Sequence, residues 1–307
     1  MSGAEGVADW LLDGDPSVRW QAERDLLDRP EVVWSTTRDR VAAEGWGRRL
    51  LGAQDPEGTW AGALYSPKWT STTYTLLLLQ RFGLPPGHEA ALAGCARLLD
   101  DAVWVDGGVS YWRTHTHAER CVNGMVLSVC SWFGLDDPRV DSIADLLLGA
   151  AMGDGAWNCR DHEGATHSSF HTTISVLEGL VAWSRFRVTT DADESMAGAH
   201  EFLLQHHLFR SHRTGEVIDD EWLKPHFPPR WHYDVLRGLD HLRDAGMRDP
   251  RAAEAVEIVR SQQRPDGRWP KGPRYPAKEW FVLEPGRVPS RWNTLRALRA
   301  LRWWDAR

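Results

Sequence analysis

The segment "LLGAQDPEGTW" at positions 50–60 decides the fold, because close copies of it occur later in the chain. They read "LLLGAAMGDGAW" at 146–157 and "IVRSQQRPDGRW" at 258–269. Each copy consists of the end of an apolar helical segment, a glycine turn and a tryptophan. Glycine suits the turn because helices commonly end in a residue with positive φ. The repetition predicts one helical unit that is used several times.

Two looser copies lie between these three, at 97–112 and 202–222. The tryptophans that end the five copies are spaced by about 50 residues: Trp60, Trp112, Trp157, Trp222 and Trp269. A second helical segment, often ending in glycine, follows each copy: YTLLLLQRFG, CVNGMVLSVCSWFG, FHTTISVLEGLVAW, YDVLRGLDHLRDAG and WNTLRALRALRWW. A unit of this kind cannot bury its apolar faces alone, so neighbouring units must stack. The pattern predicts an all-α fold of five or six helical hairpins.

The composition excludes several classes of protein. Of the 307 residues, 42% are hydrophobic, which is enough for a sizeable core. A net charge of −7 argues against a general nucleic-acid or membrane-surface binder. Four cysteines without regular spacing predict no disulfide framework. We see no signal peptide and no apolar run long enough to span a membrane, and therefore expect a cytoplasmic location.

The copies contain the pattern Q-x-x-x-G-x-W, from Gln54 to Trp60 and from Gln263 to Trp269. This pattern resembles the QW-type repeats of squalene–hopene cyclases and protein prenyltransferase β subunits, over roughly residues 45–304. The resemblance implies one domain, 1–307, that forms an (α/α) toroid of five to six helical hairpins around a central funnel. Residues 1–45 would supply N-terminal helices and residues 46–304 the five repeats. The second helices would form an inner barrel, with their N-termini at one mouth.

A cation stands before or at the start of most of these inner helices: Lys68, Arg120, Arg160, Arg230 and Arg291. Helix N-termini carry a partial positive charge, so several of them at one mouth attract anions. We therefore predict a cup for a small, partly anionic ligand. The predicted ligand-binding residues are Arg120 and Arg230, with Trp69, Trp112, Trp231 and Trp292 as aromatic walls. The alternative is that the arginines pair with local acids and the tryptophans only pack.

Two segments resemble the zinc site of protein prenyltransferases. "VDGGVSYW" (105–112) is similar to that family's V-D-G-C-x-S-x-W, and "SFHTT" (169–173) to its Y-H-T. The resemblance implies that Asp106 and His171 are zinc ligands, but Gly108 replaces the family's thiolate. Other residues with suitable donor atoms for a substitute ligand are Cys121, Cys159, His117, His162 and His167, and the spacing from His115 to Cys121 also suits a metal. The predicted metal set is Asp106, His117, Cys121, His167 and His171. The alternative is that the histidines are neutral hydrogen-bond partners.

The acidic D-x-D-D run of class II terpene cyclases is absent. The nearest sequences are "VIDDEW" (217–222) and "LDDP" (135–138), and we interpret the second as a turn or helix cap. A metal-free acid/base site is a further hypothesis, since a histidine beside a carboxylate can move protons near neutral pH. The predicted catalytic residues are His171, Asp106, Asp161, His232 and Asp234.

The leading hypothesis is an enzyme similar to squalene cyclases and prenyltransferases, acting on an isoprenoid or diphosphate-bearing substrate in the funnel. A second hypothesis is a binding or scaffold protein that has lost the catalytic motifs. A third is a carbohydrate-active (α/α) barrel, because tryptophan and histidine suit sugar stacking. The expected partner is a small molecule, and zinc is the one cofactor considered.

Overall fold

The computed structural model describes residues 3–114 and 116–306. Thirteen α-helices form the described part of the chain: α1 (Gly3–Leu12), α2 (Pro16–Asp25), α3 (Glu31–Asp39), α4 (Gly45–Leu51), α5 (Thr72–Phe82), α6 (Glu89–Asp100), α7 (Arg120–Phe133), α8 (Pro138–Leu148), α9 (Phe170–Arg187), α10 (Asp193–Gln205), α11 (Val235–Asp244), α12 (Ala253–Ser261) and α13 (Arg291–Asp305). Three short 3-10 turns accompany them: η1 (Asp161–Glu163), η2 (Asp220–Leu223) and η3 (Pro250–Ala252). The prediction of an all-α fold is confirmed.

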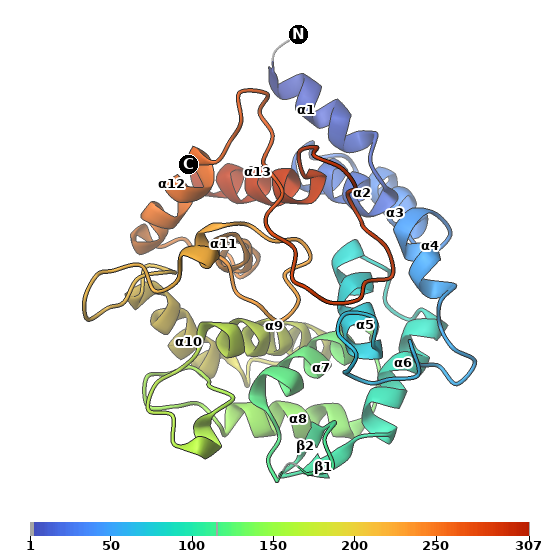
Figure 1. The fold of residues 1–307 in the computed structure, drawn as a ribbon, viewed down its shortest axis with the longest axis vertical. Coiled ribbons are helices and arrows are strands. Elements are labelled where there is room, and N and C mark those ends of the chain that lie inside the picture. Colours follow the sequence, from blue (N-terminus) through green and yellow to red (C-terminus); the bar gives the residue numbers. More distant parts are fainter. Residues whose placement is uncertain (1–2, 115, 307) are drawn as a thin grey trace.

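The second helices of the predicted repeats are α5, α7, α9, α11 and α13. Gly83 and Gly134 end α5 and α7 in the left-handed conformation, as the sequence predicts for a helix C-terminus. Helix α5 packs against α7, α7 against α9, and α11 against α13. Helix α13 in turn packs against α2, near the other end of the chain. Figure 1 shows these helices around the middle of the molecule, with α3, α4, α6, α8, α10 and α12 outside them.

The tryptophans of the three close copies have identical surroundings. Trp60, Trp157 and Trp269 are fully buried. In each, the indole N–H donates to the carbonyl ten residues earlier, in the last turns of α4, α8 or α12, at 2.7 Å. In each, the backbone N–H donates to a threonine hydroxyl at the start of the following inner helix: Thr72, Thr173 and Thr294. The repeated tryptophan therefore joins the end of an outer helix to the start of the next inner one.

The looser copies lack this arrangement. Trp222 is buried in the 3-10 turn η2, but its indole nitrogen has no hydrogen-bond partner among the described residues. Trp112 is half-buried in the segment between β2 and α7. The shared sequence pattern thus marks a shared structure only where the glycine turn and the tryptophan keep their spacing.

Helices α7 and α9 approach each other closely because each has a glycine at the crossing. A Cβ atom added to Gly124 would lie 2.6 Å from the backbone oxygen of Ser175. One added to Gly179 would lie 2.5 Å from the backbone oxygen of Gly124. Since real Cβ atoms do not approach backbone atoms so closely, these positions admit only glycine.

One feature departs from the all-helical expectation. Strands β1 (Val103–Val105) and β2 (Gly108–Ser110) form an antiparallel hairpin before α7. Asn123 of α7 fixes the hairpin, because its side chain accepts from the Val109 N–H and donates to the Val109 carbonyl. Three-residue strands are too short to show an alternating pattern in the sequence.

The segment 270–290 crosses the middle of the molecule in Figure 1 and contacts residues at the start of α5. The Lys278 carbonyl accepts from the Trp69 N–H at 2.9 Å. The Trp280 indole donates to the Thr75 hydroxyl of α5 at 3.0 Å. None of the helices in the described ranges combines the length and apolar composition that a bilayer crossing requires.

Candidate functional site

A hollow lies between the inner helices, near their C-terminal ends. Its volume is about 570 Å3, and the lining residues come from α2, α5, α7, α9, α11 and α13. Because the last turns of α2 and α5 contribute Arg24 and Arg81, the hollow lies toward the end of the inner helices opposite to the predicted mouth. A concave site of this size can hold a small molecule.

The charges that line this central cavity are mostly positive. Six arginines contribute to it: Arg24, Arg81, Arg185, Arg237, Arg243 and Arg299. Three acidic residues contribute as well: Glu178, Asp240 and Asp244. This local excess of cations contrasts with the net charge of −7 of the whole chain. An excess of one sign of charge in a low-dielectric hollow concentrates ligands of the opposite sign.

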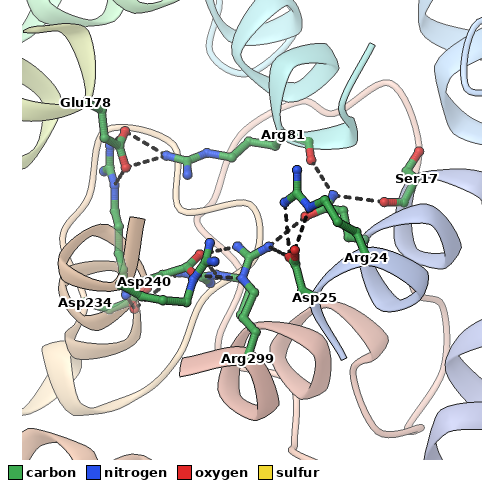
Figure 2. Close-up of polar contacts among 12 residues, drawn as sticks. Ser17, Arg24, Asp25, Arg81, Glu178, Asp234, Asp240 and Arg299 are labelled. Atoms are coloured by element: carbon green, nitrogen blue, oxygen red, sulfur yellow. Dashed lines mark hydrogen bonds and ion pairs between the residues drawn. The ribbon is translucent and has the colours of Figure 1, made fainter. Parts of the chain in front are cut away.

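Glu178 of α9 lies between two of these arginines (Figure 2). Arg81 of α5 donates to both of its carboxylate oxygens, at 2.7 and 2.8 Å. Arg237 of α11 also donates to both, at 3.0 and 2.7 Å. Burial alone would raise the pKa of Glu178, but the guanidinium groups of Arg237 and Arg81 hold it well below its usual range. Glu178 is therefore a permanent anion that shares two cations.

A second cluster of charges joins α2, α11 and α13 (Figure 2). Arg299 donates through Nε to Asp240 at 2.7 Å and through Nη1 to Gln21 at 2.8 Å. The same Nη1 lies 3.3 Å from a carboxylate oxygen of Asp25. Burial would raise the pKa of Asp240, but Arg299 and Arg243 lower it. These contacts place ordered guanidinium groups around the cavity.

Aromatic rings gather at the other end of the inner helices. The Lys68 ammonium lies 5.6 Å from the Tyr65 ring centroid, 5.7 Å from that of Trp69 and 5.3 Å from that of Trp231. These separations are within the range of cation–π attraction. His232 stacks between Trp231 and Tyr275, with centroid separations of 3.7 Å to each. The predicted residues Trp69, Trp231 and His232 thus lie together.

His171, the predicted zinc ligand and catalytic residue, lies at the edge of this aromatic cluster. Its ring centroid is 5.2 Å from that of Trp231 and 5.7 Å from that of His232. Its Nδ1 accepts a hydrogen bond from the Tyr233 N–H at 2.8 Å. Burial lowers the pKa of His171 to about 4, and the charge of Arg237 adds to the effect. The contacts are those of a neutral hydrogen-bond acceptor, which was the alternative interpretation.

The predicted metal ligands do not come together as one set. Asp106 is exposed in the turn of the β-hairpin, and His167 is exposed before α9. His115 lies outside the described residues. Among the described residues, the group of three donor atoms within 4.8 Å of one another is Glu119, Cys121 and Cys159. Asp106, His167 and His171 belong to no such group. Asp106 and His167 lie in two different exposed segments, and His171 is largely buried at the start of α9.

Little space surrounds Gly108, where the resemblance would require a thiolate ligand. A Cβ atom at this position would lie 2.3 Å from Leu146 Cδ2, 2.7 Å from Asn123 Oδ1 and 2.9 Å from Ala118 Cβ. The contact with Asn123 is part of the bond that fixes the hairpin to α7. A cysteine at this position would therefore require Leu146, Asn123 and Ala118 to shift.

The predicted cations are each engaged with a neighbouring group. Arg120 lies 2.9 Å from Asp161, a predicted catalytic residue. Arg230 pairs with Glu279 at 3.1 Å and lies over the Trp69 ring. Arg291 donates to the Trp10 carbonyl. None of these arginines contributes to the central cavity. Their part in ligand binding stays a prediction.

Two further predicted residues have structural roles. Asp234 is fully buried and caps α11, accepting from the Arg237 N–H at 2.8 Å. Trp292 is 1% exposed and stacks on Phe227, with ring centroids 4.0 Å apart. Trp292 is therefore a core residue instead of a funnel wall. Trp112, in contrast, lines a second cavity of about 320 Å3.

Sequence reasoning missed the arginines that line the cavity. Glu178, from the segment FHTTISVLEGLVAW, lies at the cavity as well. Arg24, Arg81 and Arg299 lie near the ends or in the second half of their helices, whereas the predicted cations precede the helices. A signal was present in α5, where Gln80 and Arg81 interrupt a run of buried apolar residues.

A pair of buried histidines separates the central cavity from a neighbouring one. His241 lines the central cavity and His200 a hollow of about 320 Å3 beside it. Their Nε2 atoms are 2.9 Å apart, and each residue is 6% exposed. Burial lowers the pKa of both, and that of His200 falls to about 3, with the charge of His241 contributing. The pair is therefore neutral, with one ring donating to the other.

This pair makes stability depend on pH. Unfolding returns His200 to a pKa near 6.5, so the unfolded chain binds the extra proton as the pH falls below that value. The contribution of the neutral His200 to the stability of the fold is complete above pH 6.5. It is lost as the pH falls toward about 3, the pKa of His200 in the folded protein. The free energy of unfolding of the wild type should fall when the pH is lowered from 7 to 5. In His200→Asn we expect this fall to be smaller by about 2 kcal/mol. Urea unfolding at both pH values measures the difference.

His207→Asn serves as the control, because the His207 ring is exposed two residues after the same helix. It should lose as much stability between the two pH values as the wild type does. Equal losses in all three proteins would contradict the assignment of the pH dependence to the buried pair.

Comparison with known proteins yields likenesses in structure only. No protein-family model matches the chain, and no curated protein matches it. A protein from Actinoplanes is 18% identical, with 99% of this chain and 100% of that chain covered and a TM-score of 0.50. At this identity the likeness concerns the fold alone.

A type II terpene cyclase, MstE from Scytonema, in its apo form is 16% identical over 94% of this chain and 88% of that chain, with a TM-score of 0.48. A variant of MstE in complex with its product, merosterolic acid A, is 16% identical over 87% of this chain and 96% of that chain, with a TM-score of 0.36. These two likenesses are too weak to carry a statement about this chain.

Proposed function

We propose that the chain is an (α/α) toroid of the terpene cyclase and prenyltransferase type, which binds a small, partly anionic molecule in its central cavity. The QW-type repeats at Gln54–Trp60 and Gln263–Trp269 support the fold type. So does the order of packing, in which α13 lies against α2. The inner helices then share one direction, and their C-terminal ends surround the ligand.

The excess of arginine over acid around the cavity is the observation that carries this proposal. Guanidinium groups bind phosphate and carboxylate through paired hydrogen bonds. The same cavity has an apolar side, to which Trp20, Trp132 and Phe186 contribute. A ligand that fits both sides has an anionic head and an apolar body. An isoprenoid diphosphate has this chemistry.

Titration calorimetry with three probes tests the proposal. Farnesyl diphosphate carries both the anionic head and the apolar body, farnesol carries only the body, and pyrophosphate only the head. We expect farnesyl diphosphate to bind most tightly and farnesol most weakly, since the ordered arginines recognise the head. If farnesol binds as tightly as farnesyl diphosphate, or if none of the three binds, the proposal is wrong.

Arg81→Gln is expected to weaken the binding of farnesyl diphosphate by about tenfold or more, because one charge-assisted hydrogen bond contributes roughly 1.5–3 kcal/mol. Glu178 keeps its contact with Arg237 in this variant, so the fold is retained. Arg210→Gln is the matched control, since Arg210 pairs with Glu254 at the surface and does not line the cavity. Equal affinities of the two variants would contradict the assignment of the cavity as the binding site.

Catalysis on the same ligand is the second candidate function. It is favoured by His241, a neutral imidazole at the cavity wall that is hydrogen-bonded to His200 and can exchange a proton. Incubation with farnesyl diphosphate followed by product analysis distinguishes an enzyme from a binding protein. Release of a cyclised or hydrolysed product that is lost in His241→Gln supports an enzyme. Tight binding without turnover supports a binding protein.

A further inference from the structure

Two segments that precede neighbouring helices lie side by side and present matching residues. Residues 117–121 lead into α7, and residues 159–162 precede α9. The rings of His117 and His162 stack with centroids 3.3 Å apart. Arg120 and Asp161 form an ion pair at 2.9 Å. Cys121 and Cys159 are also in contact across these two segments. The Cys121 N–H donates to Cys159 Sγ at 3.1 Å.

The two thiols and one carboxylate bring three metal-ligand atoms together. One oxygen of Glu119 and the sulfurs of Cys121 and Cys159 all lie within 4.8 Å of one another. The ligand atoms of a tetrahedral zinc ion are roughly 3.3–3.8 Å apart, given its usual bond lengths of about 2.0–2.3 Å. The three side chains are only half-buried, so rotation about their own bonds can bring the ligand atoms closer together.

Two hydrogen-bond donors are directed at the sulfur of Cys159. The Thr172 hydroxyl donates to Cys159 Sγ at 3.4 Å, in addition to the Cys121 N–H. Donors directed at a sulfur stabilise the negative charge that it carries as a ligand, and such outer contacts orient the ligands of metal sites. The ion pair of Arg120 and Asp161 holds the two segments together beside them.

We propose that Glu119, Cys121 and Cys159 bind Zn2+. Two thiolates select zinc over magnesium or calcium, which prefer oxygen. Three protein ligands leave the fourth tetrahedral position for water or for an imidazole of His117 or His162, which lie on the same segments. This site shares Cys121 with the predicted metal set and leaves out Asp106, His167 and His171. It is also independent of the ligand in the central cavity.

The test uses the full chain without a histidine tag, reduced with a phosphine, loaded with Zn2+ and separated from free metal. We expect one zinc per chain by elemental analysis. Replacement by Co2+ is expected to produce the near-ultraviolet charge-transfer absorption of thiolate-bound cobalt. This spectrum depends on the sulfurs themselves, so it reports the site in the wild type without any substitution.

Cys121→Ser and Cys159→Ser are each expected to weaken zinc binding by at least 100-fold and to abolish the cobalt absorption. Cys95→Ala is the matched control. Cys95 is fully buried and lies beside Cys130, so these two form a second close pair of cysteines. Among the described residues, Cys95 belongs to no group of three possible metal ligands. It should keep both the stoichiometry and the spectrum.

Three outcomes would overturn the proposal. The wild type binds no zinc after loading; or it binds zinc without the thiolate absorption of the cobalt form; or Cys121→Ser and Cys159→Ser bind zinc as tightly as Cys95→Ala. Circular dichroism of each variant shows whether a loss of zinc accompanies a loss of helix. If a variant is unfolded, the cobalt spectrum of the wild type decides.

Discussion

Replacing Trp157 by alanine is expected to lower the free energy of unfolding by about 3–5 kcal/mol. The indole is fully buried between α8 and α9, so its removal leaves a cavity in the core. It also removes the donor to the Leu147 carbonyl. Because proteins of this kind are stable by only about 5–15 kcal/mol, the variant should lie close to its unfolding limit at 25 °C. Denaturant unfolding followed by circular dichroism measures the loss.

Trp157→Phe separates the packing of the ring from its hydrogen bond. Phenylalanine retains most of the apolar contacts and loses the N–H donor, so we expect a smaller loss of about 1–3 kcal/mol. Trp304→Ala, a half-buried tryptophan in the last turn of α13, is the control and should lose less than Trp157→Ala. If Trp157→Ala is no less stable than Trp304→Ala, the repeated tryptophan does not join the helices as described.

Glu178→Gln is expected to destabilise the fold by about 3–5 kcal/mol at neutral pH, since it leaves buried cations without their counter-charge. The Arg237 side chain is only 2% exposed, and the carboxylate of Glu178 is its one close ionic partner in the described part of the chain. Asp244→Asn is the matched control, because Asp244 pairs with Arg185 at a site where both side chains are about half exposed. Exposed pairs contribute about 1 kcal/mol or less.

The same variant tests the anion site from another direction. Arg81 and Arg237 are freed from the carboxylate in Glu178→Gln, so pyrophosphate should raise the melting temperature of this variant more than that of the wild type. An equal increase in both proteins would mean that these two arginines do not bind the anion. The loss of stability and the gain in anion affinity have one cause, so they should appear together.

The helices could be predicted from the sequence because their signals are local. A glycine stands two residues before each of Trp60, Trp157 and Trp269. The hydrogen bonds of these tryptophans join residues that are only ten to twenty-five positions apart in the chain. The inner helices α5, α7, α9, α11 and α13 begin within about two residues of their predicted starts. Asp137, predicted as part of a turn or cap, does cap α8.

The position of the cavity could not be predicted in the same way. Periodicity shows which face of a helix is buried, but it does not show which ends of the packed helices other segments cover. Here Tyr275 and Trp280 come from a long irregular segment and pack over the helix starts, which leaves the hollow near the helix ends. The bond between Arg81 and Glu178 joins residues 97 positions apart, and no local pattern indicates it.

The contact between α2 and α13 has a consequence for biosynthesis. Arg299 approaches Asp25 across a separation of 274 residues. A ribosome adds about 5–20 residues per second, so roughly 14–55 s pass between the synthesis of Asp25 and that of Arg299. During this interval the face of α2 that will receive α13 has no partner. This face of α2 is therefore exposed to other proteins and to chaperones until α13 leaves the exit tunnel.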